Sequence, residues 1–211
     1  MPGPSPLRRL GPMKTPEPVT LEGRHVRLEP LAAEHLPGLA VAYEEDTAPF
    51  RYLGFGPGVM GWERWLAEAL GGQARGVYLP WATVLRETGH AIGSTRFGDI
   101  EPTHGRVEVG WTWLGSRYQH TAANTEAKLL QLAHAFEDLG ATRVAFKTDG
   151  RNEGSQRALE AIGATREGVL RRHMRMPDGF IRDSVYYSIL AEEWPAVRER
   201  LEARLEEKLR T

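Results

Sequence analysis

Two polar clusters in the sequence combine residue types that can bind phosphate and move protons. The first runs from Gly115 to Asn124, where small and polar residues separate an apolar stretch ending at Leu114 from a helical pattern. The free N–H groups at a helix start and the helix dipole both favour an anion. This cluster therefore predicts a binding site for a phosphate-bearing ligand.

The second cluster surrounds Asn152 and Ser155, which stand three residues apart at the start of another helical pattern. Asparagine is a common helix cap, so capping alone would explain Asn152. Ser155 and Arg157 are also ordinary residues for the exposed side of a helix. Glu108, in the strand that precedes the first cluster, offers a carboxylate that can accept a proton; pairing with an arginine is an equal alternative.

Alternating apolar residues and turn signals predict the strands that hold these clusters. The expected strands cover 24–30, 77–86, 91–99, 106–114 and 142–148, with a hairpin of 169–176 and 180–190. Apolar spacings of three and four predict the helices. The expected helices cover 32–45, 60–70 before Gly71-Gly72, 124–139 before Gly140, 153–162 and 195–209.

This order of elements predicts a single mixed α/β domain over residues 19–211. Residues 1–18 are rich in Pro and Gly and are expected to form a mobile tail. The C-terminal helix carries a narrow apolar stripe that could cover its own domain or pair with a second copy: Val197, Leu201, Leu205 and Leu209.

Composition narrows the functional classes. The formal net charge of −1 argues against binding to bulk nucleic acid, and the absence of cysteine excludes a thiol nucleophile and a thiolate metal site. No cluster resembles a metal site. No apolar run reaches the roughly 20 residues of a membrane span, and the N-terminus does not resemble a secretory signal. We therefore expect a soluble, cytoplasmic protein.

Three segments together resemble the GNAT N-acetyltransferase superfamily, in its RimJ/RimL-like branch: Glu108-Val-Gly-Trp-Thr-Trp113, Gln119 to Glu126 (QHTAANTE), and Arg151 to Arg157 with Ile162-Gly-Ala164. The resemblance extends from about Val19 to Trp194. It implies an α/β (α+β) fold with a mixed, mostly antiparallel sheet, a splayed strand pair and flanking helices. It also implies transfer of an acetyl group from acetyl-CoA to a primary amine, by direct attack.

In the family, the loop and helix start hold the pyrophosphate of acetyl-CoA, and the free edge of the preceding strand pairs with its pantetheine arm. The residues implied to bind this cofactor are Thr112, Trp113, Leu114, Gln119, His120, Thr121, Ala122, Ala123, Asn124, Thr125, Asn152, Ser155 and Arg157. The usual loop pattern is Arg/Gln-x-x-Gly-x-Gly/Ala. Here the run from Arg117 to Ala122 carries His120 where the first glycine is expected.

The resemblance also implies roles in catalysis. Glu108 would accept the proton of the amine, and Ser155 would donate a proton to the departing thiolate, a task for which many relatives use tyrosine. The residues expected on the acceptor side are Glu108, Trp111, His173 and Asp183. The acceptor could be a protein N-terminus or a small-molecule amine.

His120 keeps a second hypothesis open, a catalytically weak module or sensor that binds CoA or acetyl-CoA. A third hypothesis is a structural or scaffolding protein, but it would leave the anion-binding loop unexplained. Because related enzymes are often dimers, a homodimer is expected.

Overall fold

The computed structural model describes residues 11–47, 50–54 and 56–210. Within them, one sheet of eight strands has the order β1-β2-β3-β4-β5-β6-β8-β7. Only β5 and β6 run parallel, so the sheet is mixed and mostly antiparallel, as predicted. The strands are β1 (Leu21–Glu22), β2 (Val26–Pro30), β3 (Leu79–Leu85), β4 (Ala91–Glu101), β5 (Arg106–Leu114), β6 (Arg143–Asp149), β7 (Thr165–Arg175) and β8 (Ile181–Leu190).

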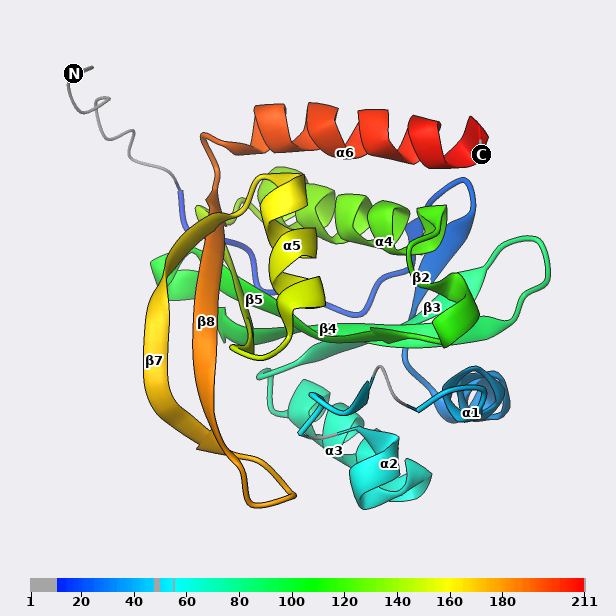
Figure 1. Ribbon diagram of the computed structural model, residues 1–211. Helices are drawn as coiled ribbons and strands as arrows, with labels where there is room; N and C mark the ends of the chain where they lie inside the picture. Colours follow the sequence, from blue (N-terminus) through cyan, green and yellow to red (C-terminus); the bar gives the residue numbers. More distant parts are fainter. Residues whose placement is uncertain (1–10, 48–49, 55, 211) are drawn as a thin grey trace.

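Helices cover both faces of the sheet (Figure 1). One face carries α4 (Ala122–Ala133), α5 (Glu153–Ile162) and α6 (Trp194–Arg210); the other carries α1 (Leu36–Glu44), α2 (Pro57–Met60) and α3 (Trp62–Ala74). Single turns complete the set: η1 (Ala33–His35), η3 (Pro102–His104), η4 (Ser116–Tyr118) and the π-helical η5 (His134–Asp138). The layered α/β class predicted from the sequence is confirmed.

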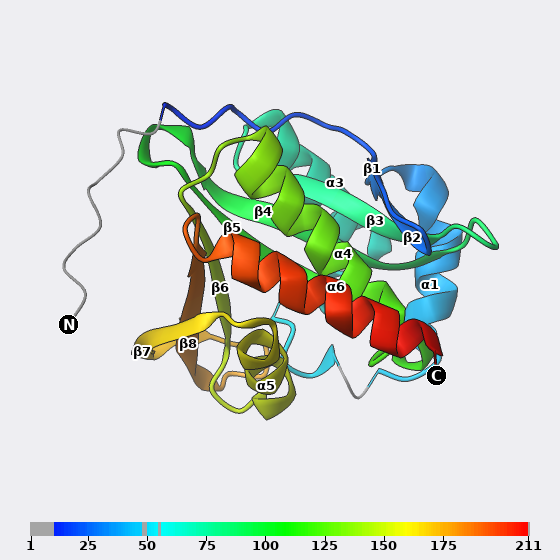
Figure 2. The same cartoon turned by 90° about the horizontal axis from the view of Figure 1, so that it is seen from above.

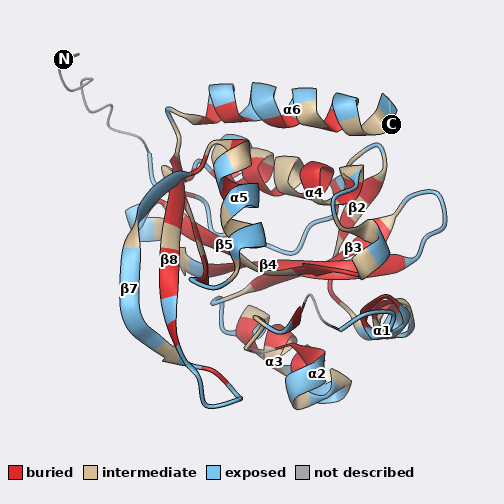
Figure 3. Ribbon diagram, in the orientation of Figure 1, coloured by how far each residue is buried: buried red, intermediate tan, exposed pale blue. Residues whose placement is uncertain are grey.

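Each face of the sheet has its own apolar core. The larger core lies beneath α4, α5 and α6, and it includes residues of all three helices and of most strands. The smaller core beneath α1 and α3 is rich in aromatic rings, among them Tyr43, Phe50, Trp65 and Trp113. Buried residues consequently line both sides of the central strands, while β7 at the sheet edge is almost entirely exposed (Figure 3).

The C-terminal helix belongs to the domain. It lies beside α4 when the molecule is seen from above (Figure 2), and the apolar stripe of Val197, Leu201 and Leu205 is buried beneath it. Of the two alternatives for this stripe, covering its own domain is the one observed. The expected homodimer stays a prediction, and this stripe is not available to form it.

The N-terminal segment differs from the expected tail. Residues 1–10 lie outside the described residues, but the Met13 side chain is buried in the larger core. The Lys14 N–H donates to the Leu139 carbonyl oxygen at 2.8 Å, and the Trp81 indole N–H donates to the Val19 carbonyl oxygen at 2.8 Å. Residues 11–18 thus have no regular secondary structure yet are docked on the domain, because one apolar side chain fills its core.

Two helix boundaries also differ from the prediction. Helix α3 continues through Gly71 and Gly72 to Ala74, because the ring of Tyr78 packs where a Cβ on Gly72 would lie. Gly72 therefore serves close packing and not termination. Helix α4 begins two residues earlier than expected, with the Thr121 hydroxyl accepting a hydrogen bond from the Ala123 N–H as its cap.

Candidate active site

A cleft opens where β5 and β6 separate. The two strands pair over only three positions, from Arg106 opposite Arg143 to Glu108 opposite Ala145, and then diverge. The cleft has a volume of about 710 Å³, and we call it the splay cleft. Its walls come from both faces of the sheet: α4, α5 and α6 on one side, and the loop Phe50–Leu53 on the other. Two ligands could therefore enter from opposite faces and meet between the strands.

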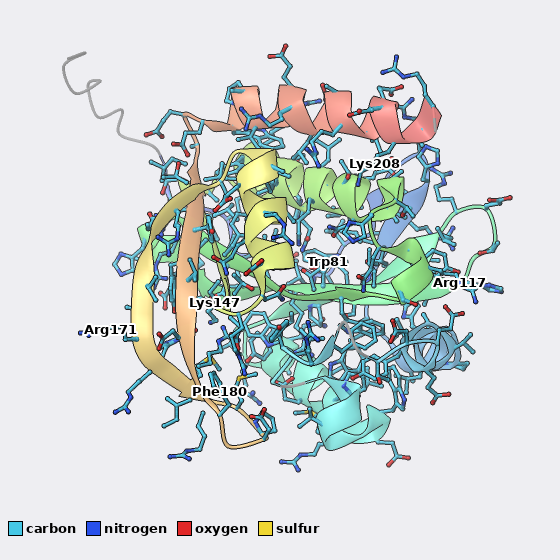
Figure 4. The ribbon with its side chains drawn as sticks, viewed as in Figure 1. Trp81, Arg117, Lys147, Arg171, Phe180 and Lys208 are labelled. Atoms are coloured by element: carbon cyan, nitrogen blue, oxygen red, sulfur yellow. The ribbon has the colours of Figure 1, made fainter. Side chains whose placement is uncertain are left out.

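The splay cleft has two ends. Its outer end is formed by the residues at the start of α4 and by side chains of α5 and α6: Gln119, His120, Asn124, Thr125, Arg157, Arg204 and Lys208. Its inner end is formed by strand side chains and the opposite loop: Phe50–Leu53, Glu108, Trp111, Lys147 and Asp149. Lys208 and Lys147 mark the two ends in Figure 4.

A β-bulge in β5 determines which of its side chains point to each face of the sheet. Ser94 is opposite Trp113 and Arg96 is opposite Gly110, so Trp111 and Thr112 together face the single residue Thr95. Trp111 is the extra residue, and its φ of 52° is in the left-handed region. Because a bulge reverses the alternation of side chains, Thr112 turns toward α4.

Trp111 and Trp113 both lie on the opposite face from Thr112. Trp113 is buried among the rings of the smaller core. Trp111 is partly exposed, packs edge-on against Tyr78 and lies 5.5 Å from the Lys147 ammonium. Both side chains line the splay cleft.

At the outer end, the start of α4 faces the cleft as an anion site requires. His120 adopts a φ of 62°, the left-handed conformation that a glycine at this position would supply. Histidine therefore replaces glycine without changing the course of the backbone. Gln119, His120, Asn124 and Thr125 line the cleft, while Thr121 caps the helix and Ala122 and Ala123 lie outside the lining.

The start of α5 forms the wall facing α4. Asn152 caps this helix, since its Oδ1 accepts a hydrogen bond from the Ser155 N–H at 3.0 Å. Asn152, Ser155 and Arg157 all line the cleft. Arg157 is exposed and makes an ion pair with Glu153 at 3.1 Å. Asn152 thus caps α5, as the sequence suggested, and it also lines the cleft.

Glu108 is the buried carboxylate of the inner end. Its Oε2 accepts a hydrogen bond from Lys147 Nζ at 2.9 Å, so its partner is a lysine and not the arginine considered from the sequence. Burial raises the pKa of the Glu108 carboxyl, and the Lys147 ammonium only partly opposes this. A carboxylate with a raised pKa is a stronger proton acceptor than an exposed one.

Two predicted acceptor-side residues, His173 and Asp183, do not line the splay cleft. Asp183 accepts a hydrogen bond from the Arg172 N–H at 2.6 Å. His173 shares a hydrogen bond of 2.9 Å with the Ser184 hydroxyl, which also accepts from Arg182, a buried cleft residue. Burial and the positive charges of Lys147 and Arg182 lower the pKa of His173. His173 thus contacts Ser184, which in turn contacts the cleft residue Arg182.

Lys128 is a cleft residue that sequence reasoning missed. Its ammonium donates to the Thr112 hydroxyl at 2.9 Å and to Gln131 Oε1 at 3.3 Å, and no carboxylate pairs with it among the described residues. Burial lowers the pKa of Lys128 to about 7. One signal was present in the sequence: Lys128 stands four residues after Asn124 and hence on the same face of α4.

Lys147, Asp149 and Arg182 are further cleft residues that the sequence did not single out. Asp149 is buried and pairs with Arg151 at 2.8 Å. Burial opposes the negative charge of Asp149, but the hydrogen bonds from Arg151 hold its pKa below the usual value. The inner end consequently holds two carboxylates, each with its own cation.

Metal ions and membranes have no recognisable site in the described part of the chain. No group of three or more His, Asp or Glu side chains is arranged to hold a metal ion there. Among the same residues, no helix is both long enough and apolar enough to cross a membrane.

Comparison with known proteins gives consistent matches. A family model described as an acetyltransferase (GNAT) domain matches residues 25–165. A GCN5-related N-acetyltransferase from Brucella melitensis superposes with a TM-score of 0.86 at 32% identity, covering 94% of this chain and 90% of that one. A provisionally assigned acetyltransferase from T. thermophilus has a TM-score of 0.78 at 48% identity, covering 90% and 98% of the two chains.

A curated relative extends this picture. The provisionally named ribosomal N-acetyltransferase YdaF of Bacillus subtilis (strain 168) is 26% identical over 176 residues, which cover 79% of this chain and 90% of that protein. Its name agrees with the RimJ/RimL-like branch that the sequence resembles.

Proposed function

The chain belongs to the GNAT family of acetyltransferases, and we propose that it transfers the acetyl group of acetyl-CoA to a primary amine within the splay cleft. The acetyltransferase activity follows from the family. The cofactor, the acceptor and the residues that act on them are the proposal. The observation that carries the proposal is a cleft that is lined from both faces of the sheet and has a buried carboxylate, Glu108, at its inner end.

The donor would occupy the outer end. The N–H groups at the start of α4 are available for the pyrophosphate of acetyl-CoA, and the helix dipole adds to their attraction. The pantetheine arm would extend along Thr112–Leu114, where β5 has no β6 neighbour to pair with. His120 supports this arrangement, because its left-handed φ keeps the backbone path of the expected glycine.

The acceptor amine would reach the inner end from the face of Phe50–Leu53. Glu108, directly or through water, would accept the proton that an ammonium must lose before it can attack. The amine nitrogen would then form a bond to the acetyl carbonyl carbon, with a backbone N–H of β5 stabilising the developing oxyanion. The C–S bond would break as the carbonyl re-forms. Ser155 would donate its hydroxyl proton to the CoA thiolate and regain a proton from the amine nitrogen, which leaves as the neutral amide.

The acceptor is proposed as a protein N-terminus or a small-molecule amine. The name of the B. subtilis relative supports a ribosomal protein N-terminus as the first candidate. The half-exposed Trp111 and Tyr52, with the paired charges of Asp149 and Arg151, offer apolar and polar contacts to a short peptide. The enzyme is further proposed to be cytoplasmic and to form a homodimer through a surface other than the α6 stripe.

Release of the CoA thiol in the presence of an amine panel tests this function. The panel would contain N-terminal peptides of ribosomal proteins, free amino acids, polyamines and aminoglycosides, with mass spectrometry of each product. We expect thiol release that depends on at least one amine, and a product heavier by one acetyl group. Tight acetyl-CoA binding without turnover on any amine would instead support a CoA-binding module.

A further inference from the structure

The C-terminal helix brings positive charge to the outer end of the splay cleft. Arg204 and Lys208 of α6 line the cleft opposite Arg157 of α5. Figure 4 shows Lys208 on the side of α6 that is turned toward α4. This helix lies beyond residues 25–165, the part of the chain that the family model matches.

Carboxylates of the protein neutralise the two arginines poorly. Arg204 makes no ion pair within the described part of the chain. Arg157 has only Glu153, and both side chains are more than 70% exposed, so this pair is weak. Burial and the nearby positive charge of Arg204 lower the pKa of Lys208, while Glu207 opposes this only slightly. Two cations held side by side at the edge of a cleft are stabilised by an anion between them.

Lys208 is also fixed in position. Its ammonium donates to the carbonyl oxygen of Thr121 at 2.9 Å, and Thr121 is the residue that caps α4. The end of α6 is thereby tied to the start of α4, next to the N–H groups proposed for the pyrophosphate. Arg204 lies one helical turn further back, so positive charge continues beyond those N–H groups.

We propose that Arg157, Arg204 and Lys208 form a binding site for the 3′-phosphate of the CoA ribose. This inference rests on the proposed function. CoA carries a pyrophosphate and, separately, a phosphomonoester that is close to a dianion at neutral pH. The N–H groups of α4 account for the first group, and three side-chain cations match the charge and position of the second. The site would make the enzyme select CoA over its 3′-dephospho form.

The test is to titrate the full-length protein with CoA and with 3′-dephospho-CoA by calorimetry. The variants are R204Q alone and R204Q combined with K208Q, in which glutamine keeps a donor for the Thr121 carbonyl. The matched control is R198Q, which removes the same charge from the same helix at a residue paired with Glu137 and Glu202. Thermal unfolding of each variant would verify that α6 stays folded.

We expect the natural protein to bind CoA roughly tenfold more tightly than 3′-dephospho-CoA. The preference should fall to about threefold in R204Q, disappear in the double variant and persist in R198Q. It should also shrink as salt rises. Equal affinity of the natural protein for both ligands would overturn the site, and so would an equal loss for both in the double variant, which would assign these cations to the pyrophosphate. If neither ligand binds, the proposed function fails as well.

Discussion

Among the described residues, the arginines at the outer end of the splay cleft have weak carboxylate partners or none, whereas the carboxylates at the inner end are buried and paired with cations. At the outer end, helix N–H groups and side-chain cations would meet a ligand that brings its own negative charge. At the inner end, Glu108 already has Lys147 as a partner, and its burial changes its affinity for protons. Ligand binding would thus depend on the positive charge and helix N–H groups of the outer end, and proton transfer on the buried carboxylate of the inner end. Substitutions at one end can therefore test one property without the other.

The largest expected effect is at the inner end. E108Q keeps the shape of the side chain but cannot accept a proton, so kcat/KM should fall by about 10²–10³-fold. The affinity for CoA should stay within about twofold. Because burial raises the pKa of Glu108, the rate of the natural enzyme should rise with pH through that raised value, and this limb should be absent in E108Q. Steady-state kinetics from pH 5 to 9 would measure both.

E153Q is the matched control for this variant. It removes a carboxylate from the exposed start of α5, where Glu153 pairs with Arg157. Its pH profile should match that of the natural enzyme. A profile of E108Q that keeps its acidic limb would show that another group is the base.

The next effect concerns Lys128, at the junction of the two ends. Its folded-state pKa of about 7 is below the unfolded value, so the unfolded chain binds more protons between these two pH values. The penalty for burying the ammonium is fully present below pH 7 and disappears as pH rises toward the unfolded pKa. K128M should therefore stabilise the protein relative to the natural sequence at pH 7, by an amount that falls by roughly 2 kcal/mol at pH 9.

Urea unfolding at the two pH values measures this difference. K14M is a suitable control, because the Lys14 side chain is exposed. Its effect on the free energy of unfolding should be the same at pH 7 and pH 9. An identical pH dependence in K128M and K14M would contradict the assignment to Lys128.

A smaller effect is expected where the two ends meet on α5. S155A removes the hydroxyl proposed to protonate the CoA thiolate, and kcat should fall by about tenfold while CoA affinity is retained. S155T, which keeps a hydroxyl, should recover most of the rate. If both variants lose CoA affinity and keep kcat, Ser155 belongs to binding at the outer end and not to chemistry.

The smallest effect is at the outer end itself. His120 has a positive φ, which costs a residue with a Cβ about 1 kcal/mol. H120G should therefore stabilise the protein by about 0.5–1 kcal/mol, after the greater flexibility of glycine in the unfolded chain is included. H120A keeps the strained backbone and should give no gain. Thermal unfolding of the two variants would distinguish relief of strain from loss of the imidazole.

Sequence patterns predicted the fold because its elements are locally encoded. Alternation in β5 and the three–four spacing in α4 specify a strand and a helix without reference to the rest of the chain. Gly72 of α3 shows where this fails, because it makes room for the ring of Tyr78, which packs on the helix from the segment that follows it. Met13 is a second example, since nothing near it in the sequence indicates that the larger core has room for it.

Cleft residues could be predicted from the sequence where they lie at the start of a predicted helix. Several expected residues at the starts of α4 and α5 do line the splay cleft, because the sequence pattern predicts both helix starts: Gln119, His120, Asn124, Thr125, Asn152, Ser155 and Arg157. Lys147 and Lys128 were not found, because their role depends on β6 lying beside β5 and on α4 lying over Thr112. His173 was expected in the site from its place in a hairpin, but the register of β7 with β8 directs it toward Ser184.

The bulge at Trp111 has a consequence for how such an enzyme can change. Because one extra residue assigns the Thr112 side chain to the α4 face and the Trp111 and Trp113 side chains to the other, side chains on the proposed donor face and on the proposed acceptor face alternate along one strand. A substitution at Trp111 can remodel one face and leave the other intact. On the proposed function, a change at Trp111 would alter the choice of acceptor and leave the donor unchanged. Deleting a single residue from β5 would exchange the two faces and remove both functions at once.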